Sequence, residues 1–185
     1  MEKHDTPTLE AGTNIAVTFA RMNIPHPGHV HLVKKMLECG DQAVVCLSTA
    51  KKNTPFGYRA ELLFLLCEKE GLPLDRIHIE PAANPYEAVE TVTSDWWSGL
   101  TDIVKLLNTT VVLGVDQAIL AQRLHDDLGV DFELNEVRVG SSTVIRYFLE
   151  IGEEQIVRDI YYNDDRLFNM VLNLRNHELS RDEKS

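Results

Sequence analysis

The sequence predicts an α/β protein with a Rossmann-like, doubly wound parallel sheet of five strands, followed by C-terminal helices. Short apolar, β-branched runs alternate with longer segments of helical periodicity, and Gly, Pro and Asn punctuate the boundaries between them. The length of 185 residues suits one domain with a buried core. We therefore expect a single domain over residues 1–185, with flexible ends at 1–13 and 179–185.

Five runs have the composition of strands. The first, second and fourth are mostly apolar runs, as expected for strands buried on both faces of a sheet, and the third is a short strand. The fifth alternates polar and apolar residues, which suits a strand at a sheet edge with one wet face. The expected strands are Asn14–Phe19, Ala43–Leu47, Arg76–Glu80, Thr110–Leu113 and Phe132–Val139.

The helices are expected between these strands and after the last one. Apolar residues at helical spacing define them, and glycines such as Gly40, Gly71 and Gly129 mark their ends. The expected helices run from about His29 to Gly40, Tyr58 to Glu70, Tyr86 toward Leu107, Gln117 to Leu128, Gly140 to Glu150, Glu153 to Tyr161 and Asp165 to His177.

Composition and charge exclude several function classes. The net charge of −11 argues against a protein that coats nucleic acid or an anionic membrane. Cys39, Cys46 and Cys67 each lie in apolar runs without a zinc or redox spacing, and we expect buried free thiols in a reducing cytoplasm. The N-terminus has no signal-peptide pattern, and no apolar run is long enough to span a membrane.

The charge is distributed unevenly. Residues 1–60 carry a net charge of +2, so the remaining 125 residues carry −13. In a parallel sheet, small ligands bind beyond the carboxyl ends of the strands, where the strand order reverses. The loops after Phe19 and Leu47 belong to the basic part of the chain, so the acidic total is compatible with a local basic pocket at these loops.

The loop after the first expected strand contains His26-Pro-Gly-His29 at the start of a helix. Two imidazoles in the first turn can face one ligand, Gly28 allows close approach to the backbone, and the free N–H groups of the helix favour an anion. This pattern predicts a phosphate site. The alternative is that both histidines only cap and pack the helix; a metal site is disfavoured because no third ligand lies nearby in sequence.

The loop after the fifth expected strand contains Gly140-Ser-Ser-Thr-Val-Ile-Arg146. Ser142 or Thr143 can cap the following helix, and Arg146 lies one turn further on the same side. Hydroxyl groups, free N–H groups and a guanidinium together predict a second phosphate-binding loop. The alternative is an ordinary N-cap followed by a surface arginine.

Together these segments resemble the HxGH nucleotidyltransferase family, the cytidylyltransferase-like group. The family pattern GRFxPxHxGH corresponds to Ala20-Arg-Met-Asn-Ile-Pro-His-Pro-Gly-His29, and ISSTxIR corresponds to Gly140–Arg146. Lys51-Lys52 and Pro55-Phe-Gly-Tyr-Arg59 match a basic loop and a PFxxxER-like segment, and Gly114-Val-Asp116 matches GxD. The resemblance covers about residues 14–150, and the archaeal-type nicotinamide mononucleotide (NMN) adenylyltransferases are the most similar group.

The resemblance implies transfer of an adenylyl group from ATP to the phosphate of a small acceptor, with release of pyrophosphate and with Mg²⁺ carried by the triphosphate. His26, His29 and Arg146 would be catalytic, the histidines at the α-phosphate and Arg146 at the β- and γ-phosphates. The implied nucleotide-binding residues are Ala20, Arg21, Met22, Gly28, Lys51, Lys52, Arg59, Gly114, Asp116, Ser141, Ser142 and Thr143.

The acceptor is less well defined than the reaction. NMN is slightly favoured, which would give NAD, and Trp96 and Trp97 are the implied acceptor-binding residues, with helix packing as the alternative for at least one of them. Phosphopantetheine, glycerol phosphate and CTP in place of ATP stay open, as does a homo-oligomer. Ala20 replaces the family's usual glycine, which also leaves open a nucleotide-binding regulator with little turnover. An interaction module without enzymatic function would require both phosphate loops to be coincidental.

Overall fold

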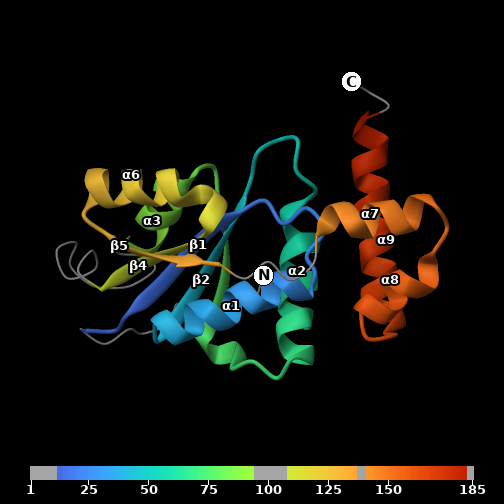
Figure 1. Cartoon of the computed structure of the whole chain (residues 1–185), viewed down its shortest axis with the longest axis horizontal. Coiled ribbons are helices and arrows are strands. Elements are labelled where there is room, and N and C mark those ends of the chain that lie inside the picture. The colour runs from blue at the N-terminus through green and yellow to red at the C-terminus, as the bar shows by residue number, and fades with distance from the viewer. Residues whose placement is uncertain (1–11, 94–107, 137–140, 183–185) are drawn as a thin grey trace, which may run out of the picture.

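The computed structural model describes residues 12–93, 108–136 and 141–182. Its centre is an all-parallel five-stranded sheet with the order β3-β2-β1-β4-β5 (Figure 1), so the predicted fold class is confirmed. The strands are β1 (Ile15–Ala20), β2 (Gln42–Ser48), β3 (Ile77–Ala82), β4 (Thr109–Gly114) and β5 (Asp131–Asn135). The order reverses between β1 and β4, which places the switch point of the sheet beside the loop after β1.

Each predicted strand is present within a few residues of its expected bounds. β5 lies at the sheet edge, as its alternating pattern predicted. It ends at Asn135, whereas the predicted continuation to Val139 runs into residues 137–140, which lie outside the described ranges. A Cβ atom added to Gly40 would lie 2.7 Å from the backbone nitrogen of Ala16, so only glycine allows the chain to pass this closely between the first helix and β2.

The helices follow the predicted order. They are α1 (Pro27–Cys39), α2 (Phe56–Lys69), α3 (Pro85–Thr93), α6 (Ala118–Leu128), α7 (Ser142–Glu150), α8 (Glu154–Ile160) and α9 (Asp165–Asp182), with short 3₁₀ turns at Leu74–Arg76 and Val115–Gln117. Two boundaries correct the prediction. α1 begins at Pro27 because His26 caps it, and α9 continues past His177 to Asp182, through residues that were expected to be loose.

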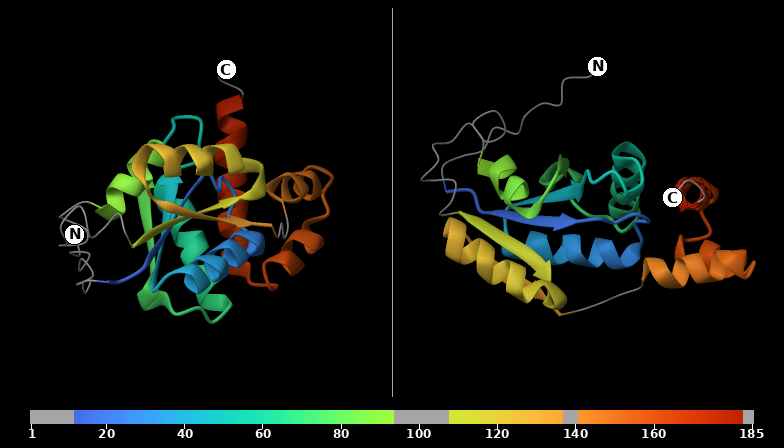
Figure 2. Two further views of the ribbon diagram at one scale, coloured as in Figure 1. Left: turned by 60° about the vertical axis from the view of Figure 1, so that its left-hand side comes forward. Right: turned by 90° about the horizontal axis from the view of Figure 1, so that it is seen from above.

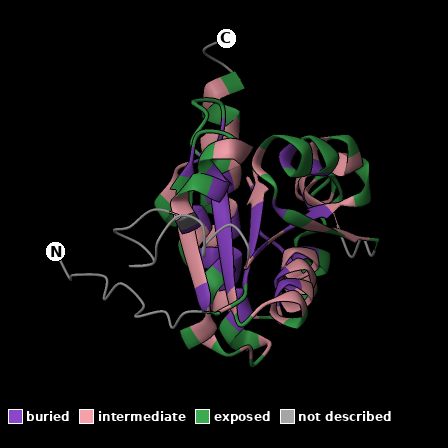
Figure 3. Cartoon of the chain, turned by 90° about the vertical axis from the view of Figure 1, so that its left-hand side faces the viewer, coloured by how far each residue is buried: buried purple, intermediate pink, exposed green. Residues whose placement is uncertain are grey.

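The sheet is buried on both faces (Figure 2). Side chains alternate along each strand, so Ala16 of β1 packs toward α1 and α2, whereas Ile15 and Val17 pack toward α3 and α6. Figure 3 shows the buried residues concentrated on the strands and on the helix faces that cover them. Cys46 and Cys67 are buried free thiols as predicted, while Cys39 is only half-buried.

Helices α7, α8 and α9 gather at one end of the molecule, next to α2 (Figure 1). Ion pairs join α2 to the region of α9: Lys69 Nζ lies 2.8 Å from Asp164 Oδ2, and Arg166 NH2 lies 2.9 Å from Glu61 Oε1. Hydrogen bonds from Ser142 and Tyr161 to the carbonyls of Ile24 and Pro25 bring these helices beside the loop after β1. Within the described ranges, no helix has the length and apolarity needed to cross a membrane.

Candidate functional site

The two histidines of His26-Pro-Gly-His29 form a reciprocal cap at the start of α1. The backbone N–H of Gly28 donates to Nδ1 of His26, and the backbone N–H of His26 donates to Nδ1 of His29, both at 3.1 Å. The two ring centroids are 3.8 Å apart. The arrangement is a capping box in which imidazoles replace the usual hydroxyl and carboxylate.

These hydrogen bonds determine the protonation of both rings. Because each Nδ1 accepts a backbone N–H, the proton of the neutral ring must be on Nε2. Burial lowers the pKa of His26 to about 4, and burial together with the neighbouring His26 lowers the pKa of His29 well below its ordinary value. Both imidazoles are therefore neutral near pH 7, and each keeps an Nε2–H donor for an anion.

The loop between β1 and α1 is fixed from several directions. Met22 has a φ of 42°, a left-handed conformation that is uncommon for a residue with a large side chain, and its side chain is buried in the core. Ile24 is also fully buried. The hydroxyl of Tyr161 donates to the carbonyl of Pro25 at 2.6 Å, directly before His26. The histidines are thus held by a constrained loop rather than by α1 alone.

The start of α7 lies against the same loop. Ser141 caps α7 by accepting the backbone N–H of Thr143 at 3.1 Å, so the cap lies one residue before Ser142 and two before Thr143, the two predicted caps. The hydroxyl of Ser142 donates to the carbonyl of Ile24 at 3.1 Å. Ser142 therefore links the two predicted phosphate loops, which are far apart in sequence. Thr143 is exposed.

An apolar pocket lies between the first turns of α1 and α7. Its volume is about 340 Å³, and its lining comes from both predicted phosphate loops and from α8: His26, Pro27, Gly28, Ser141, Val144, Ile145 and Ile160. A flat, mostly apolar group such as a nucleobase fits a lining of this kind. The structure thus brings four of the predicted site residues, His26, Gly28, Ser141 and the neighbouring His29, into one place.

A second pocket, of about 260 Å³, also includes a residue of α7 and is strongly charged. Asn23 of the β1–α1 loop lines it together with four cationic side chains, Lys52, Arg146, Arg175 and Arg181, and two carboxylates, Glu178 and Asp182. Arg146 makes two hydrogen bonds to Glu178, from Nε at 2.9 Å and from NH2 at 2.6 Å. The predicted residues Lys52 and Arg146 are brought together here.

Sequence reasoning missed the contribution of α9 to this second pocket. Arg175 and Arg181 lie on a helix without a recognisable phosphate motif, in the acidic part of the chain. The sequence signal is partial: Arg175, Glu178 and Asp182 recur at intervals of three and four and so share one face of the helix, and Arg181 follows Glu178 by three residues.

Of the two arginines in the predicted phosphate approach, Arg59 is buried and Arg21 is exposed. Arg59 is 1% exposed and donates to the carbonyls of Arg21 and Ser48, the latter at 2.8 Å. Burial and the nearby Arg181 lower its pKa to about 10. This geometry favours a role in joining the loops after β1 and β2. Its position three and four residues before the buried Leu62 and Leu63 is a signal that could have predicted this burial.

The remaining predicted residues lie near the same sheet edge or outside the described ranges. Ala20 ends β1, and Gly114 ends the adjacent β4, where a Cβ would lie 2.6 Å from Oδ1 of Asp116. The Arg21 and Lys51 side chains are exposed. Trp96 and Trp97, the predicted acceptor-binding residues, lie in residues 94–107, outside the described part of the chain.

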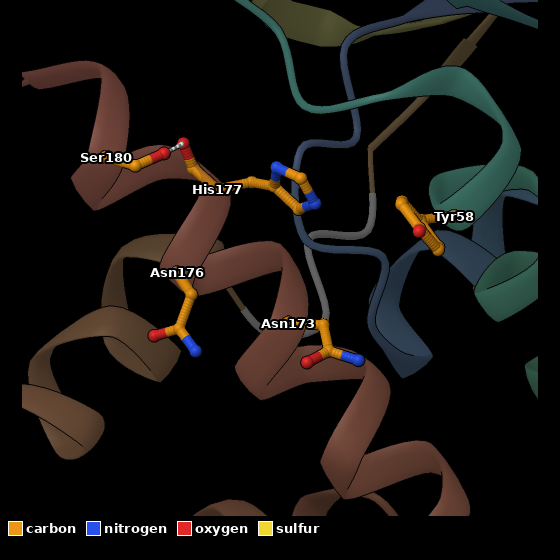
Figure 4. Close-up of a pocket in the computed structure, with 5 residues that line it drawn as sticks. All are labelled: Tyr58, Asn173, Asn176, His177 and Ser180. Atoms are coloured by element: carbon orange, nitrogen blue, oxygen red, sulfur yellow. Dashed lines mark hydrogen bonds between the residues drawn. The ribbon is translucent and has the colours of Figure 1, made fainter.

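A third pocket, of about 410 Å³, lies between the start of α2 and the C-terminal part of α9 (Figure 4). It is lined by Tyr58, Asn173, Asn176, His177 and Ser180. The His177 ring points toward the ring of Tyr58, and the ring centroids are 5.5 Å apart. The lining carries amides, hydroxyls and two rings but no lysine, arginine or carboxylate, which distinguishes it from the charged pocket on the adjacent face of α9.

In residues 12–93, 108–136 and 141–182, no group of three or more His, Cys, Asp or Glu side chains is arranged to hold a metal ion. The sequence matches no protein-family model and no curated protein.

The fold is similar to that of solved nucleotide adenylyltransferases. One is a bifunctional NMN adenylyltransferase/ADP ribose pyrophosphatase from Francisella tularensis, with a TM-score of 0.54 and 17% identity over 70% of this chain. The alignment spans only 39% of that bifunctional protein. Another is a putative nicotinate-nucleotide adenylyltransferase from Vibrio parahaemolyticus, with a TM-score of 0.54 and 19% identity over 76% of this chain and 82% of the other. At these identities the likeness establishes the fold.

Proposed function

We propose that the chain is a nucleotidyltransferase that moves an adenylyl group from ATP to the phosphate of a small acceptor and releases pyrophosphate. The observation that carries this proposal is the pair His26 and His29. Two neutral imidazoles, each oriented through Nδ1, stand at the N-terminus of α1, next to the switch point of the sheet. The similarity of the fold to that of two adenylyltransferases supports it.

In this reaction an acceptor phosphate oxygen attacks the α-phosphorus of ATP, and the bond from that phosphorus to the oxygen bridging to the β-phosphate breaks. The pair of electrons leaves with pyrophosphate, which carries Mg²⁺. The protein aligns attacker and leaving group and stabilises the charge that develops on the phosphate oxygens. No covalent intermediate with the protein is required.

The histidines act on the α-phosphate through their Nε2–H groups. Neutral donors suit this position because a bound phosphate raises the pKa of both rings and strengthens the hydrogen bonds as negative charge builds up. The free N–H groups of the first turn of α1 add to this stabilisation. His29 stabilises the transition state, and His26 holds the same phosphate beside the acceptor.

The two pockets beside α7 suit the two ends of ATP. The apolar pocket at Val144, Ile145 and Ile160 accommodates the adenine ring, while the charged pocket at Lys52 and Arg146 binds the β- and γ-phosphates. Gly114 and Asp116, at the end of the strand next to β1, flank the nucleoside. Mg²⁺ enters bound to the triphosphate.

NMN is our first candidate for the acceptor. The archaeal-type NMN adenylyltransferases have the most similar motifs, and one structural neighbour is named as an NMN adenylyltransferase. Trp96 and Trp97 are proposed to contact the acceptor. Nicotinate mononucleotide, phosphopantetheine and glycerol phosphate are the alternatives to be tested in parallel, with CTP as the alternative donor.

The test is pyrophosphate release with ATP or CTP and each of these acceptors. We expect release with ATP and one acceptor, and a strong decrease in the variant His29→Gln, which keeps a cap but removes the imidazole. Absence of release with every pair would contradict the proposed reaction.

A second candidate is a nucleotide-binding regulator, which Ala20 favours because its methyl group stands where the family's glycine leaves room for nucleotide. Calorimetry separates the two candidates. Tight ATP binding without turnover, unchanged in His29→Ala, would favour the regulator.

A further inference from the structure

We propose that the C-terminal helix α9 supplies part of the triphosphate site: Arg175 and Arg181 bind the terminal phosphates beside Arg146, and Glu178 is an internal anion that these phosphates displace. The inference rests on the proposed function, because it assumes that the charged pocket takes the polyphosphate end of ATP. It gives α9 a role in phosphate binding in addition to the two predicted phosphate loops.

The charged pocket is assembled from distant parts of the chain. Asn23 and Lys52 come from the loops after β1 and β2, Arg146 comes from α7, and the other lining residues come from α9. Four cationic side chains face two carboxylates, in a chain whose net charge is −11. Such a local positive excess in an acidic protein attracts a small polyanion specifically to this pocket.

Glu178 occupies the position that a phosphate group would take. Its two oxygens accept hydrogen bonds from Nε and NH2 of Arg146 at 2.9 and 2.6 Å, and Oε2 also accepts one from NH1 of Arg175 at 3.3 Å. The Glu178 side chain is 13% exposed, so the contact is largely shielded from water. Two arginines converging on one pair of oxygens is the geometry with which guanidinium groups bind phosphate.

Arg59 adds positive charge behind the pocket. Its buried guanidinium donates to backbone carbonyls, its Nε has no hydrogen-bond partner, and it lies close enough to Arg181 for the two charges to interact. Among the described residues, it forms no ion pair with a carboxylate. Glu178 and Asp182 neutralise only part of the positive charge in and behind this pocket. A bound polyphosphate would neutralise the rest.

This arrangement predicts selectivity for chain length. AMP ends at the α-phosphate, which we place at His26 and His29, and it does not reach α9. ATP and inorganic tripolyphosphate carry enough charge to replace Glu178 on Arg146. The α9 arginines should therefore contribute to binding of the triphosphates and not of AMP.

The experiment measures ATP, AMP and inorganic tripolyphosphate binding by calorimetry in the full chain. We expect Arg175→Gln and Arg181→Gln each to weaken ATP and tripolyphosphate binding about tenfold and to leave AMP binding unchanged. The matched control is Arg166→Gln on the same helix, since Arg166 pairs with Glu61 outside the pocket. This control should bind all three like the wild type.

Glu178→Gln tests the displacement. Loss of the competing carboxylate charge should strengthen tripolyphosphate binding several-fold, whereas weaker binding would show that Glu178 only positions Arg146 and would overturn the displacement. If a glutamine variant does not fold, Arg175→Lys and Arg181→Lys replace it and should show intermediate affinity, because lysine keeps the charge but loses the forked geometry.

The outcomes separate this inference from the proposed function. If the wild type binds ATP and the α9 variants bind it as tightly as Arg166→Gln, the role of α9 is overturned while the nucleotidyltransferase proposal stands. If the wild type binds neither ATP nor tripolyphosphate, both proposals are contradicted.

Discussion

The imidazole of His29 accepts the backbone N–H of His26, and this single hydrogen bond couples the first turn of α1 to the orientation of a catalytic candidate. His26 in turn accepts the N–H of Gly28 through its own Nδ1. Capping and chemistry therefore are not alternatives at this position. The same rings cap the helix through Nδ1 and keep Nε2–H, through which the proposed contact to phosphate would be made.

Replacing His29 should accordingly have two separable effects. His29→Ala removes a transition-state donor and a cap, so we expect turnover to decrease by a factor on the order of 10² to 10³ and the free energy of unfolding to decrease by about 1 kcal/mol. His29→Gln retains an acceptor for the N–H of His26 and should recover most of the stability but not the turnover. Urea unfolding and pyrophosphate release measure the two effects. Full turnover in His29→Gln would exclude the catalytic role.

The buried histidines should make stability depend on pH. The pKa of His26 is about 4 in the folded chain and about 6.5 when unfolded, so between these values the unfolded state binds more protons. Stability should be complete above pH 6.5 and should decrease as pH falls toward 4, by at most about 1.4 kcal/mol per pH unit for one such group.

His26→Asn is the variant that checks this dependence, because asparagine is a good N-cap that does not titrate. Urea unfolding between pH 4 and 7 should show a shallower decrease in stability for the variant than for the wild type. The same decrease in both proteins would mean that His26 is not the group responsible. The remaining slope belongs to other histidines such as His29 and His78, whose pKa values are also lowered by desolvation.

The sequence predicted the sheet and its helices because burial on two faces leaves a local signal. Continuous apolar strands and helical spacing of apolar residues depend on neighbours in the chain, and the observed order matches them. The signals for the two predicted phosphate loops were also local, since His26 and Ser141 are each the N-cap of a helix that the sequence predicted after a strand.

The charged pocket could not be predicted in the same way. Arg146 meets Glu178 and Arg175 only because α9 returns beside α7, and no local pattern encodes this tertiary contact. The choice of Ser141 over Ser142 as cap likewise depends on the carbonyl of Ile24, which engages the Ser142 hydroxyl from a distant loop. Site residues that depend on packing between distant segments leave little trace in periodicity.

Arg59 provides a prediction that separates positioning from binding. Arg59→Met removes the donors for the carbonyls of Arg21 and Ser48 and should lower the free energy of unfolding by about 2–4 kcal/mol. Arg59→Lys keeps the charge but cannot reach both carbonyls with one fork, so it should recover only part of the stability. Chemical denaturation measures both. If Arg59→Met is as stable as the wild type but binds substrate weakly, Arg59 contacts the ligand instead.

Tyr161 should influence catalysis without touching the substrate. Its buried hydroxyl donates to the carbonyl of Pro25 at 2.6 Å, and Pro25 immediately precedes His26. Tyr161→Phe leaves that carbonyl without its donor, so we expect a loss of about 1–2 kcal/mol in stability. A small displacement of His26 should lower kcat several-fold while KM for ATP changes little, because alignment of the reacting groups is sensitive to small shifts.

Tyr162→Phe is the matched control for this substitution. The hydroxyl of Tyr162 donates to Glu70, the residue that follows α2, away from the β1–α1 loop, and burial together with that carboxylate raises the pKa of Tyr162. The control should lose stability to a similar extent and keep kcat, because it removes a hydroxyl of the same kind without altering the support of His26. Steady-state kinetics on both variants at equal folded fraction decide the question. An unchanged kcat in Tyr161→Phe would show that the loop holds His26 through Met22, Ile24 and Ser142 alone, without the Tyr161 hydrogen bond.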